Sequence, residues 1–373
     1  MQPVHFKSAS YSQPVLKSAV WALMDACGGS AISAGDRVLV KPNLLLPARP
    51  ESGILTHPDI VAAACEFALQ RGAAVLVADS PATGIFKRIV KKGGFAQALA
   101  GLDIELRPFR ETTMVDIGAP FGNIALAREA LEADFVINLA KLKTHSQMLL
   151  TLGVKNLFGC VVGMEKPQWH LRSGVDRDWF ARLLVQIHYA IRPMLTLVDG
   201  ILALEGDGPG KGGQPCHMGM LLAGRDAATV DAAVCRMLGI DPGKLPTHRA
   251  AAARGLVDGQ VELRGDFKTV AGFRLPEQGP VDFGPDFLKG FIRSHVLQKP
   301  VVDDRRCRSC GECWTFCPAT AVFESGRSVA FDYARCIRCY CCVEVCPHGA
   351  LAARMPRTGR VLGRLGLIKQ RPH

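Results

Sequence analysis

The sequence predicts an α/β fold with a mostly parallel sheet and flanking helices, followed by a small α+β unit that is rich in cysteine. Between residues 38 and 239, short apolar runs alternate with segments of helical periodicity, as in parallel strands joined by crossover helices. Nine of the 14 cysteines then lie between Cys307 and Cys346. A chain of 373 residues is long enough for two or three domains.

The elements of the α/β part follow from local patterns. Two segments are predicted as helices: residues 58–70, where Pro58 suits a first helical position, and residues 227–238, where apolar residues recur at helical spacing. Short apolar runs predict strands at residues 37–41, 73–78, 134–139, 194–198 and 218–223.

Composition also predicts where the domains end. Residues 267–290 are rich in Gly, Pro and Asp and have no clear period, which indicates irregular structure and a boundary near Gln298. We therefore expect an α/β domain over residues 1–297, a cysteine-rich domain over residues 298–353 and a basic tail over residues 354–373.

Charge and hydropathy exclude several classes of protein. The hydrophobic fraction of 48% is enough for a large core, and no apolar run reaches the length of a membrane span. The net charge is +11, but six cations without an acid lie in the tail, and no basic stripe is interleaved with aromatic residues, so nucleic acid is not an expected partner. The tail is instead an expected contact for an acidic protein or an anionic membrane surface. We expect a cytoplasmic protein, because no apolar leader segment opens the sequence.

The cysteines form an internal repeat. The pattern C-x2-C-x2-C-x3-C-P starts at Cys307 and again at Cys336, and reduced thiols packed this densely favour metal binding. Three cysteines at spacing three suit one face of a cuboidal iron–sulfur cluster, and in two-cluster proteins the fourth cysteine of each run serves the other cluster. One [4Fe–4S] cluster is then expected on Cys307, Cys310, Cys313 and Cys346, and a second on Cys336, Cys339, Cys342 and Cys317.

With all these residues present, residues 299–353 resemble a bacterial-type two-cluster ferredoxin. A pair of four-cysteine zinc sites is the alternative, but zinc sites do not need a third cysteine at the same spacing followed by C-P. Cys341 has no place among the eight ligands and is interpreted as a bystander.

Polar residues follow the predicted strands of the α/β part, where ligands bind in open sheets of this class. Three lysines, three carboxylates and a histidine would form a crevice for an anionic substrate, with groups able to move protons or hold a metal ion. Ordinary solvated loops are the alternative interpretation of such residues. The candidates are Lys41, Asn43, Asp79, Lys141, Lys143, His145, Asp199 and Glu205.

The glycine-rich segment at residues 205–213 does not match a phosphate-binding loop. Lys211 is followed by Gly212 rather than Ser or Thr, and Glu205 stands where that motif needs Gly. No dinucleotide motif lies between a strand and a helix. We therefore interpret this segment as a flap beside the crevice.

Longer motifs resemble the domain-of-unknown-function 362 family over residues 38–245. They are K-P-N-L at 41–44, T-H-P at 56–58, D-S-P at 79–81, K-L-K-T-H at 141–145, G-V-K-N-L-F-G at 153–159 and V-D-G-I…E-G at 198–206. The resemblance implies a pairing with a C-terminal two-cluster ferredoxin domain and adds Lys155 and Asn156 to the candidates. It implies no particular reaction.

Three functions are consistent with this sequence. The first is an oxidoreductase whose ferredoxin domain passes low-potential electrons to an anionic substrate, or to a further cofactor, in the α/β crevice. The second is a non-catalytic electron-transfer subunit that docks on a separate enzyme, and the third is a structural or redox-sensing iron–sulfur protein. The crevice residues favour the first function, and the missing cofactor motif favours the second.

Overall fold

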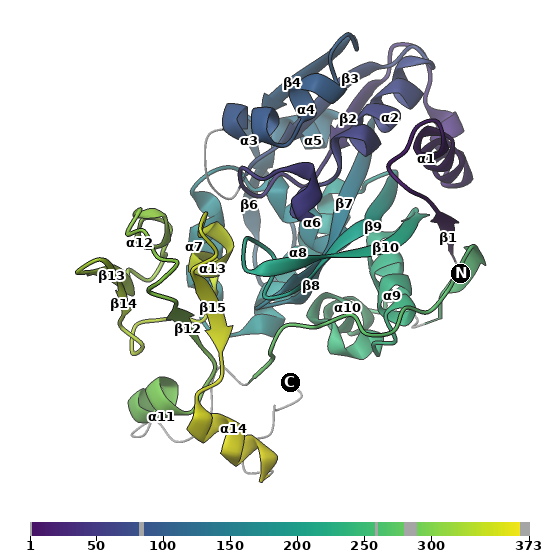
Figure 1. Cartoon of the computed structure of the whole chain (residues 1–373). Coiled ribbons are helices and arrows are strands. Elements are labelled where there is room, and N and C mark those ends of the chain that lie inside the picture. The colour runs from purple at the N-terminus through teal and green to yellow at the C-terminus, as the bar shows by residue number, and fades with distance from the viewer. Residues whose placement is uncertain (1, 82–85, 258–259, 280–288, 366–373) are drawn as a thin grey trace.

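The computed structural model of the chain describes residues 2–81, 86–257, 260–279 and 289–365. It confirms the predicted α/β fold: a large, mostly parallel sheet with helices is followed by a small C-terminal unit with short antiparallel strands (Figure 1). No helix within these ranges is long and apolar enough to cross a membrane.

The large sheet has nine strands among the described residues, in the order β11-β1-β10-β9-β7-β2-β3-β4, with β8 paired to β7. From β9 to β4 each pair along this order is parallel, whereas β10 is antiparallel to both of its neighbours. The carboxyl ends of the parallel strands therefore lie at one edge. The bounds are β1 Pro3–Ser8, β2 Arg37–Lys41, β3 Ala74–Asp79, β4 Ile104–Pro108, β7 Phe135–His145, β8 Leu149–Thr151, β9 Leu195–Gly206, β10 Gly213–Gly224 and β11 Glu262–Gly265.

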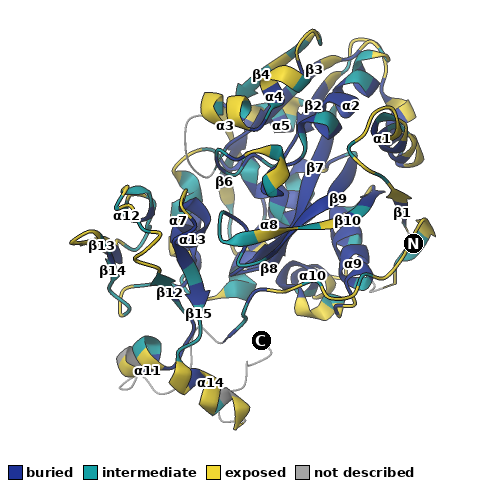
Figure 2. Cartoon of the chain, viewed as in Figure 1, coloured by how far each residue is buried: buried dark blue, intermediate teal, exposed yellow. Residues whose placement is uncertain are grey.

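Alternate residues of the central strands pack on opposite faces of the sheet. On β2, Val38 and Val40 join a core with α1 (Val15–Ala26) and α2 (Pro58–Leu69), whereas Leu39 joins a core with α8 (Arg177–Ile191). Figure 2 shows the central strands buried between these layers. Because both faces are covered, the central strands are continuous apolar runs, which is why the sequence predicted them.

Side-chain caps begin several of the helices. The Asp59 N–H donates to Nδ1 of His57 at the start of α2, and the Thr229 N–H donates to Asp226 at the start of α9 (Ala227–Met237). Such caps satisfy donors that a helix start leaves unpaired. Both predicted helices are confirmed, each ending one residue earlier than expected.

Other described elements complete the α/β part. They are α3 Phe86–Lys92, α4 Phe95–Ala98, β5 Thr112–Asp116, β6 Asn123–Ala127, α5 Arg128–Glu132, α6 Gly153–Asn156, α7 Glu165–Ser173 and α10 Pro246–Ala252.

The C-terminal unit is built from two short antiparallel sheets of two strands each and two short helices. Strand β12 (Lys299–Val302) pairs with β15 (Leu351–Arg354), and β13 (Val322–Ser325) pairs with β14 (Ser328–Phe331). Helix α13 lies beside α7 of the α/β part in the view of Figure 1. The helices of this unit are α12 Glu312–Thr315 and α13 Cys341–Val345, and α11 Lys289–His295 and α14 Arg357–Arg364 flank it.

The predicted ends of two strands are wrong. Strand β7 continues through residues 141–145, and β9 continues through residues 199–206, so five of the candidate side chains lie inside strands rather than in loops after them. These polar residues can lie in extended strands because residues far away in the sequence provide hydrogen-bonding partners for their side chains. The five are Lys141, Lys143, His145, Asp199 and Glu205.

Candidate functional site

Most of the candidate residues meet one another at the carboxyl edge of the sheet. Lys41 at the end of β2 and Asp79 at the end of β3 form an ion pair of 2.9 Å between Nζ and Oδ1, and both side chains are buried. The second carboxylate oxygen of Asp79 accepts the Leu44 N–H at 2.9 Å. Gly159 allows this packing, because an added Cβ would collide with both members of the pair.

A second buried pair joins Lys141 of β7 to Asp199 of β9, with 2.6 Å between Nζ and Oδ2. The Tyr11 hydroxyl donates to the other oxygen of Asp199 at 2.8 Å, and the His57 N–H donates to Oδ2 at 3.0 Å. Burial lowers the pKa of Lys141, and Asp199 opposes that shift. This network is satisfied internally, which is typical of a structural role.

A third group consists of Lys143, Asn43 and Asn156. Lys143 Nζ donates to Oδ1 of Asn43 at 2.7 Å and to the Ile54 carbonyl at 2.9 Å. Asn43 in turn donates to Oδ1 of Asn156 on α6 at 3.0 Å. Burial, followed by the charge of Lys155, lowers the pKa of Lys143 to about 7. This group links the buried edge of the sheet to the residues of α6.

His145, at the end of β7, faces the C-terminal unit. Its Nε2 lies 2.6 Å from Oε1 of Glu344 on α13, while its Nδ1 accepts the N–H groups of Gln147 and Met148. Burial lowers the pKa of His145 to about 4, so the ring is neutral near pH 7 and its proton is on Nε2. Burial alone would raise the pKa of Glu344, but Lys155 and His145 together hold it below its usual range.

Glu205 does not join these residues. Its carboxylate accepts from Nε of Arg274 at 2.7 Å and from the Arg274 N–H at 2.9 Å. The glycine-rich loop that follows β9 packs on the C-terminal unit: Asp207 pairs with Arg354, and a Cβ added to Gly210 would lie 2.8 Å from the Glu344 carbonyl.

A cavity of about 680 Å³, including its mouth, lies where the two parts of the chain meet. Phe316, Cys341, Glu344 and Val345 line it from the C-terminal unit. Four predicted candidates line it from the α/β part, whereas Lys41, Lys141, Lys143, His145, Asp199 and Glu205 are not among its lining residues. The α/β lining is Asn43, Leu44, Leu45, Asp79, Ser80, Lys155, Asn156, Phe158, Gly159, Lys166, Pro167 and His170.

Lys166 and His170, both on α7, are lining residues that the sequence did not indicate. Lys166 Nζ donates to the carbonyl and the hydroxyl of Ser80 at 2.7 and 2.8 Å, and burial, opposed by Asp79, lowers its pKa to about 7. His170 is 4% exposed, its Nδ1 has no hydrogen-bond partner among the described residues, and burial lowers its pKa to about 3.

Lys155 also lines the cavity, and its Nζ makes no hydrogen bond or ion pair with any described residue, yet its charge lowers the pKa values of Lys143 and Glu344. Lys166 and Lys155 thus give the cavity two amino groups that form no ion pair with a described carboxylate. Apolar walls adjoin them, so the cavity suits a small organic anion.

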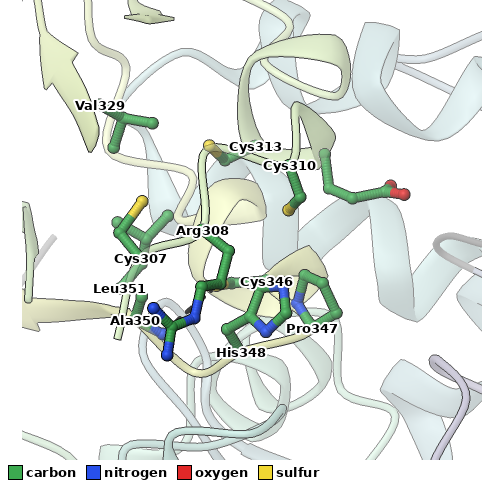
Figure 3. A pocket seen from close by; sticks show the side chains of 11 residues that line it. Cys307, Arg308, Cys310, Cys313, Val329, Cys346, Pro347, His348, Ala350 and Leu351 are labelled. Carbon is green, nitrogen blue, oxygen red and sulfur yellow. Dashed lines mark hydrogen bonds between the residues drawn. The ribbon is translucent and has the colours of Figure 1, made fainter. Parts of the chain in front are cut away.

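The first cysteine run surrounds a separate cavity of about 310 Å³. Figure 3 shows the sulfurs of Cys307, Cys310 and Cys313 facing this space, with Cys346 on its far side. Cys346 comes from the second run, as the crossed assignment requires. Within the described ranges, no three His, Cys, Asp or Glu side chains are grouped as they would be around a single metal ion. The four thiols instead line one shared space.

The cysteines of the second run gather with Cys317. Burial raises the pKa of Cys342 strongly, and Cys339, Cys336 and Cys317 are the next largest causes, in that order. The Sγ of Cys317 accepts the Ala321 N–H at 3.2 Å, and that of Cys346 accepts the Ala350 N–H at 3.3 Å. Backbone donors to sulfur are typical of iron–sulfur sites. The arrangement therefore fits a second cluster beside the first.

The two parts of the chain match two known families. Residues 38–236 match the family described as "Domain of unknown function (DUF362)", and residues 299–347 match a "4Fe-4S dicluster domain". A thylakoid-associated protein of Synechocystis is 38% identical over 301 residues, which are 78% of this chain and 94% of that protein.

Shorter matches are to subunits of oxidoreductases. The delta subunit of NADH-dependent phenylglyoxylate dehydrogenase from Aromatoleum evansii is 37% identical over 20% of this chain and 86% of the subunit. Subunit PorD of pyruvate synthase from Thermotoga maritima is 32% identical over 16% of this chain and 60% of the subunit. The lactate racemase apoprotein from Thermoanaerobacterium thermosaccharolyticum has a TM-score of 0.37 at 13% identity, covering 52% of this chain and 50% of that one, too little to show a shared fold.

Proposed function

Because the chain belongs to the DUF362 family and carries a 4Fe-4S dicluster domain, we propose that it is a ferredoxin-linked oxidoreductase. In this proposal, electrons pass between the C-terminal unit and an anionic molecule in the cavity between the two parts of the chain. The observation that carries the proposal is the lining of that cavity: Phe316 and Cys341, which adjoin Cys317 and Cys342 in sequence, form one wall, and α/β residues form the other.

The proposed cofactors are two [4Fe–4S] clusters. Such clusters carry single electrons at low potential. The cavity among the cysteines of the first run supports the first ligand set, Cys307, Cys310, Cys313 and Cys346. The mutual influence of the other thiols supports the second, Cys336, Cys339, Cys342 and Cys317. The C-P step after each run turns the chain so that the fourth thiol reaches the other group.

Within the cavity, the proposed roles of the residues differ from those expected from sequence. Lys155 and Lys166 would hold the anionic group, because their ammonium groups have no carboxylate partner within hydrogen-bond distance. Lys166 could also release a proton near pH 7 as negative charge arrives. Asp79 is held by Lys41, which leaves it to orient the lining rather than to move protons or hold a metal ion. The same space would admit a further cofactor.

A redox partner protein is part of the proposal. Two relatives are, by name, subunits of enzymes that oxidise or form 2-oxo acids, and an electron carrier would dock near the exposed cluster ligand Cys310. If the cavity binds nothing, the second candidate applies: an electron-transfer subunit without its own reaction. The third candidate, a structural or redox-sensing role, does not require any molecule to bind in the cavity.

For location, we propose the cytoplasm, because thiols stay reduced there and eight of them are needed as ligands. The Synechocystis relative is named for its association with thylakoids. Fractionation of cells followed by immunodetection would show whether this chain is recovered with the membranes or free of them.

The test is single-turnover oxidation of the anaerobically purified, chemically reduced protein. Cluster absorbance would be followed after mixing with small organic anions that carry a reducible group, such as 2-oxo acids. We expect at least one anion to reoxidise the protein, and a Lys155→Ala, Lys166→Gln variant to lose this reaction while keeping its iron and sulfide. Lys7→Ala, which removes an exposed lysine on β1, is the control. Reoxidation by none of the anions would favour the docking subunit, and equal rates in the double variant would place the anion elsewhere.

A further inference from the structure

The helices on either side of the C-terminal unit pack against each other. Ile292, Val296 and Leu297 form a small core that Leu362 of α14 joins, and the Thr358 hydroxyl donates to the His295 carbonyl. An added Cβ on Gly359 would collide with the Val296 carbonyl, so the two helices are in close contact there. In Figure 1 this helix pair projects away from the large sheet.

The outer face of α14 combines cations with apolar side chains. Arg357, Arg360 and Arg364 are exposed and recur at spacings of three and four, so they lie along one side of the helix. Val361 and Leu365, which are 55% and 66% exposed, lie next to that row. The buried Gly359 and the half-buried Leu362 fall on the opposite side.

Helix α11 also has an exposed apolar side chain and no acidic residue. Phe291 is 62% exposed, although a ring of this size is normally buried. Neither helix contains an acidic residue, and the three arginines of α14 have no partner among the described residues. Figure 2 shows α14 mostly exposed, whereas α11 combines exposed, half-buried and buried residues.

We propose that this helix pair docks the protein on an anionic phospholipid surface. Exposed apolar side chains would enter the boundary between headgroups and acyl chains, while the arginines would contact lipid phosphates. An acidic protein would match the arginines but would leave Phe291, Val361 and Leu365 without a reason to be exposed together. The proposal does not depend on the reaction in the cavity.

The test uses full-length, cluster-loaded protein and sedimentation with vesicles of phosphatidylcholine, with or without phosphatidylglycerol. We expect binding to the anionic vesicles that weakens with salt, and no binding to the neutral ones. Arg357→Gln, Arg360→Gln, Arg364→Gln should weaken binding by about 100-fold, at about fivefold per arginine. The variant Phe291→Ser, Val361→Ser, Leu365→Ser should weaken vesicle binding at high salt at least as strongly as the arginine variant does.

Two control variants change arginines or apolar side chains at exposed positions outside the helix pair. Arg88→Gln, Arg254→Gln, Arg327→Gln makes the same change in net charge at exposed positions, and Met114→Ser, Leu171→Ser removes exposed apolar side chains. Both should bind like the wild type. The proposal is wrong if the wild type ignores anionic vesicles, if the control arginines matter equally, or if the apolar variant binds unchanged. That last result would identify the patch as a purely electrostatic contact into which no apolar side chain inserts.

Discussion

The Nε2 of His145, on the central strand β7, lies 2.6 Å from Oε1 of Glu344, on helix α13 of the C-terminal unit. Glu344 is two residues from Cys342 and two from Cys346, and it also lines the cavity. One buried contact therefore connects the sheet, the cavity and the cysteine unit. The family motif at residues 141–145 thus ends on the residue that meets the C-terminal unit.

The first prediction concerns this contact. Glu344→Ala should destabilise the docked arrangement by roughly 1 to 3 kcal/mol, because it removes the carboxylate that lies against the buried Nε2 of His145. Hydrogen exchange should speed up in α13 and in β7 together. Glu324→Ala removes an exposed carboxylate from β13 of the same unit and is the control. Faster exchange in α13 alone would show that Glu344 stabilises only its own helix.

The second prediction tests the crossed ligand sets. Cys346→Ser should damage the same cluster as Cys307→Ser, since both thiols line one cavity. Cys317→Ser should damage the cluster of the second run. Electron paramagnetic resonance of the reduced proteins would distinguish the two signals, and iron analysis would follow the loss. Matching spectra for Cys317→Ser and Cys307→Ser would contradict the crossing.

The fold could be predicted because its signals are local. The valines of β2 and β3 are buried on one face of the sheet, and Leu39 and Leu76 pack on the other, so each strand is an apolar run that is visible without a structure. The ends of β7 and β9 could not be predicted, because Lys141 and Asp199 are individually polar and become strand residues only through each other, 58 positions apart. A lysine in sequence looks the same whether it meets water or a distant carboxylate.

The cavity residues show the same limit. Asn43, Asp79, Lys155 and Asn156 belong to motifs that follow strands or match the family, and they do line the cavity. Lys166 and His170 lie on helix α7, which does not follow a predicted strand, so the rule that ligands bind after strands did not select them. Glu344 lies within the cysteine run, where the sequence was interpreted only for its cysteines. The spacing of Lys166 and His170, four residues apart on one helix, was the available signal.

The third prediction corrects an expectation about Asp199. The sequence predicts it just after a strand, in a loop, whereas the structure buries it completely with Lys141 and Tyr11. Asp199→Asn should therefore cost about 3 to 5 kcal/mol, because it leaves a buried ammonium group without its counter-ion. Asp134→Asn, which breaks an exposed pair with Arg37, should cost less than about 1 kcal/mol. Equal unfolding midpoints in urea for the two variants would contradict this.

The fourth prediction concerns acid stability. Burial lowers the pKa of His170 to about 3 in the folded protein, whereas the unfolded chain binds this proton near pH 6.5. Since the unfolded state binds more protons below about pH 6.5, stability falls as the pH falls through that value. From about pH 7.5 to about pH 5.5, His170 alone should cost roughly 1.4 kcal/mol.

His170→Phe should remove that cost, because the ring can still pack beside Phe180 and Phe158 but cannot bind a proton. Its stability should therefore fall less steeply than that of the wild type between the two pH values, in anaerobic urea unfolding with cluster absorbance as a check on integrity. His217→Gln alters an exposed histidine and should follow the wild-type curve. Parallel curves for His170→Phe and the wild type would mean that the imidazole is protonated in the folded cavity, and would make it a cationic contact for the bound anion rather than a neutral wall.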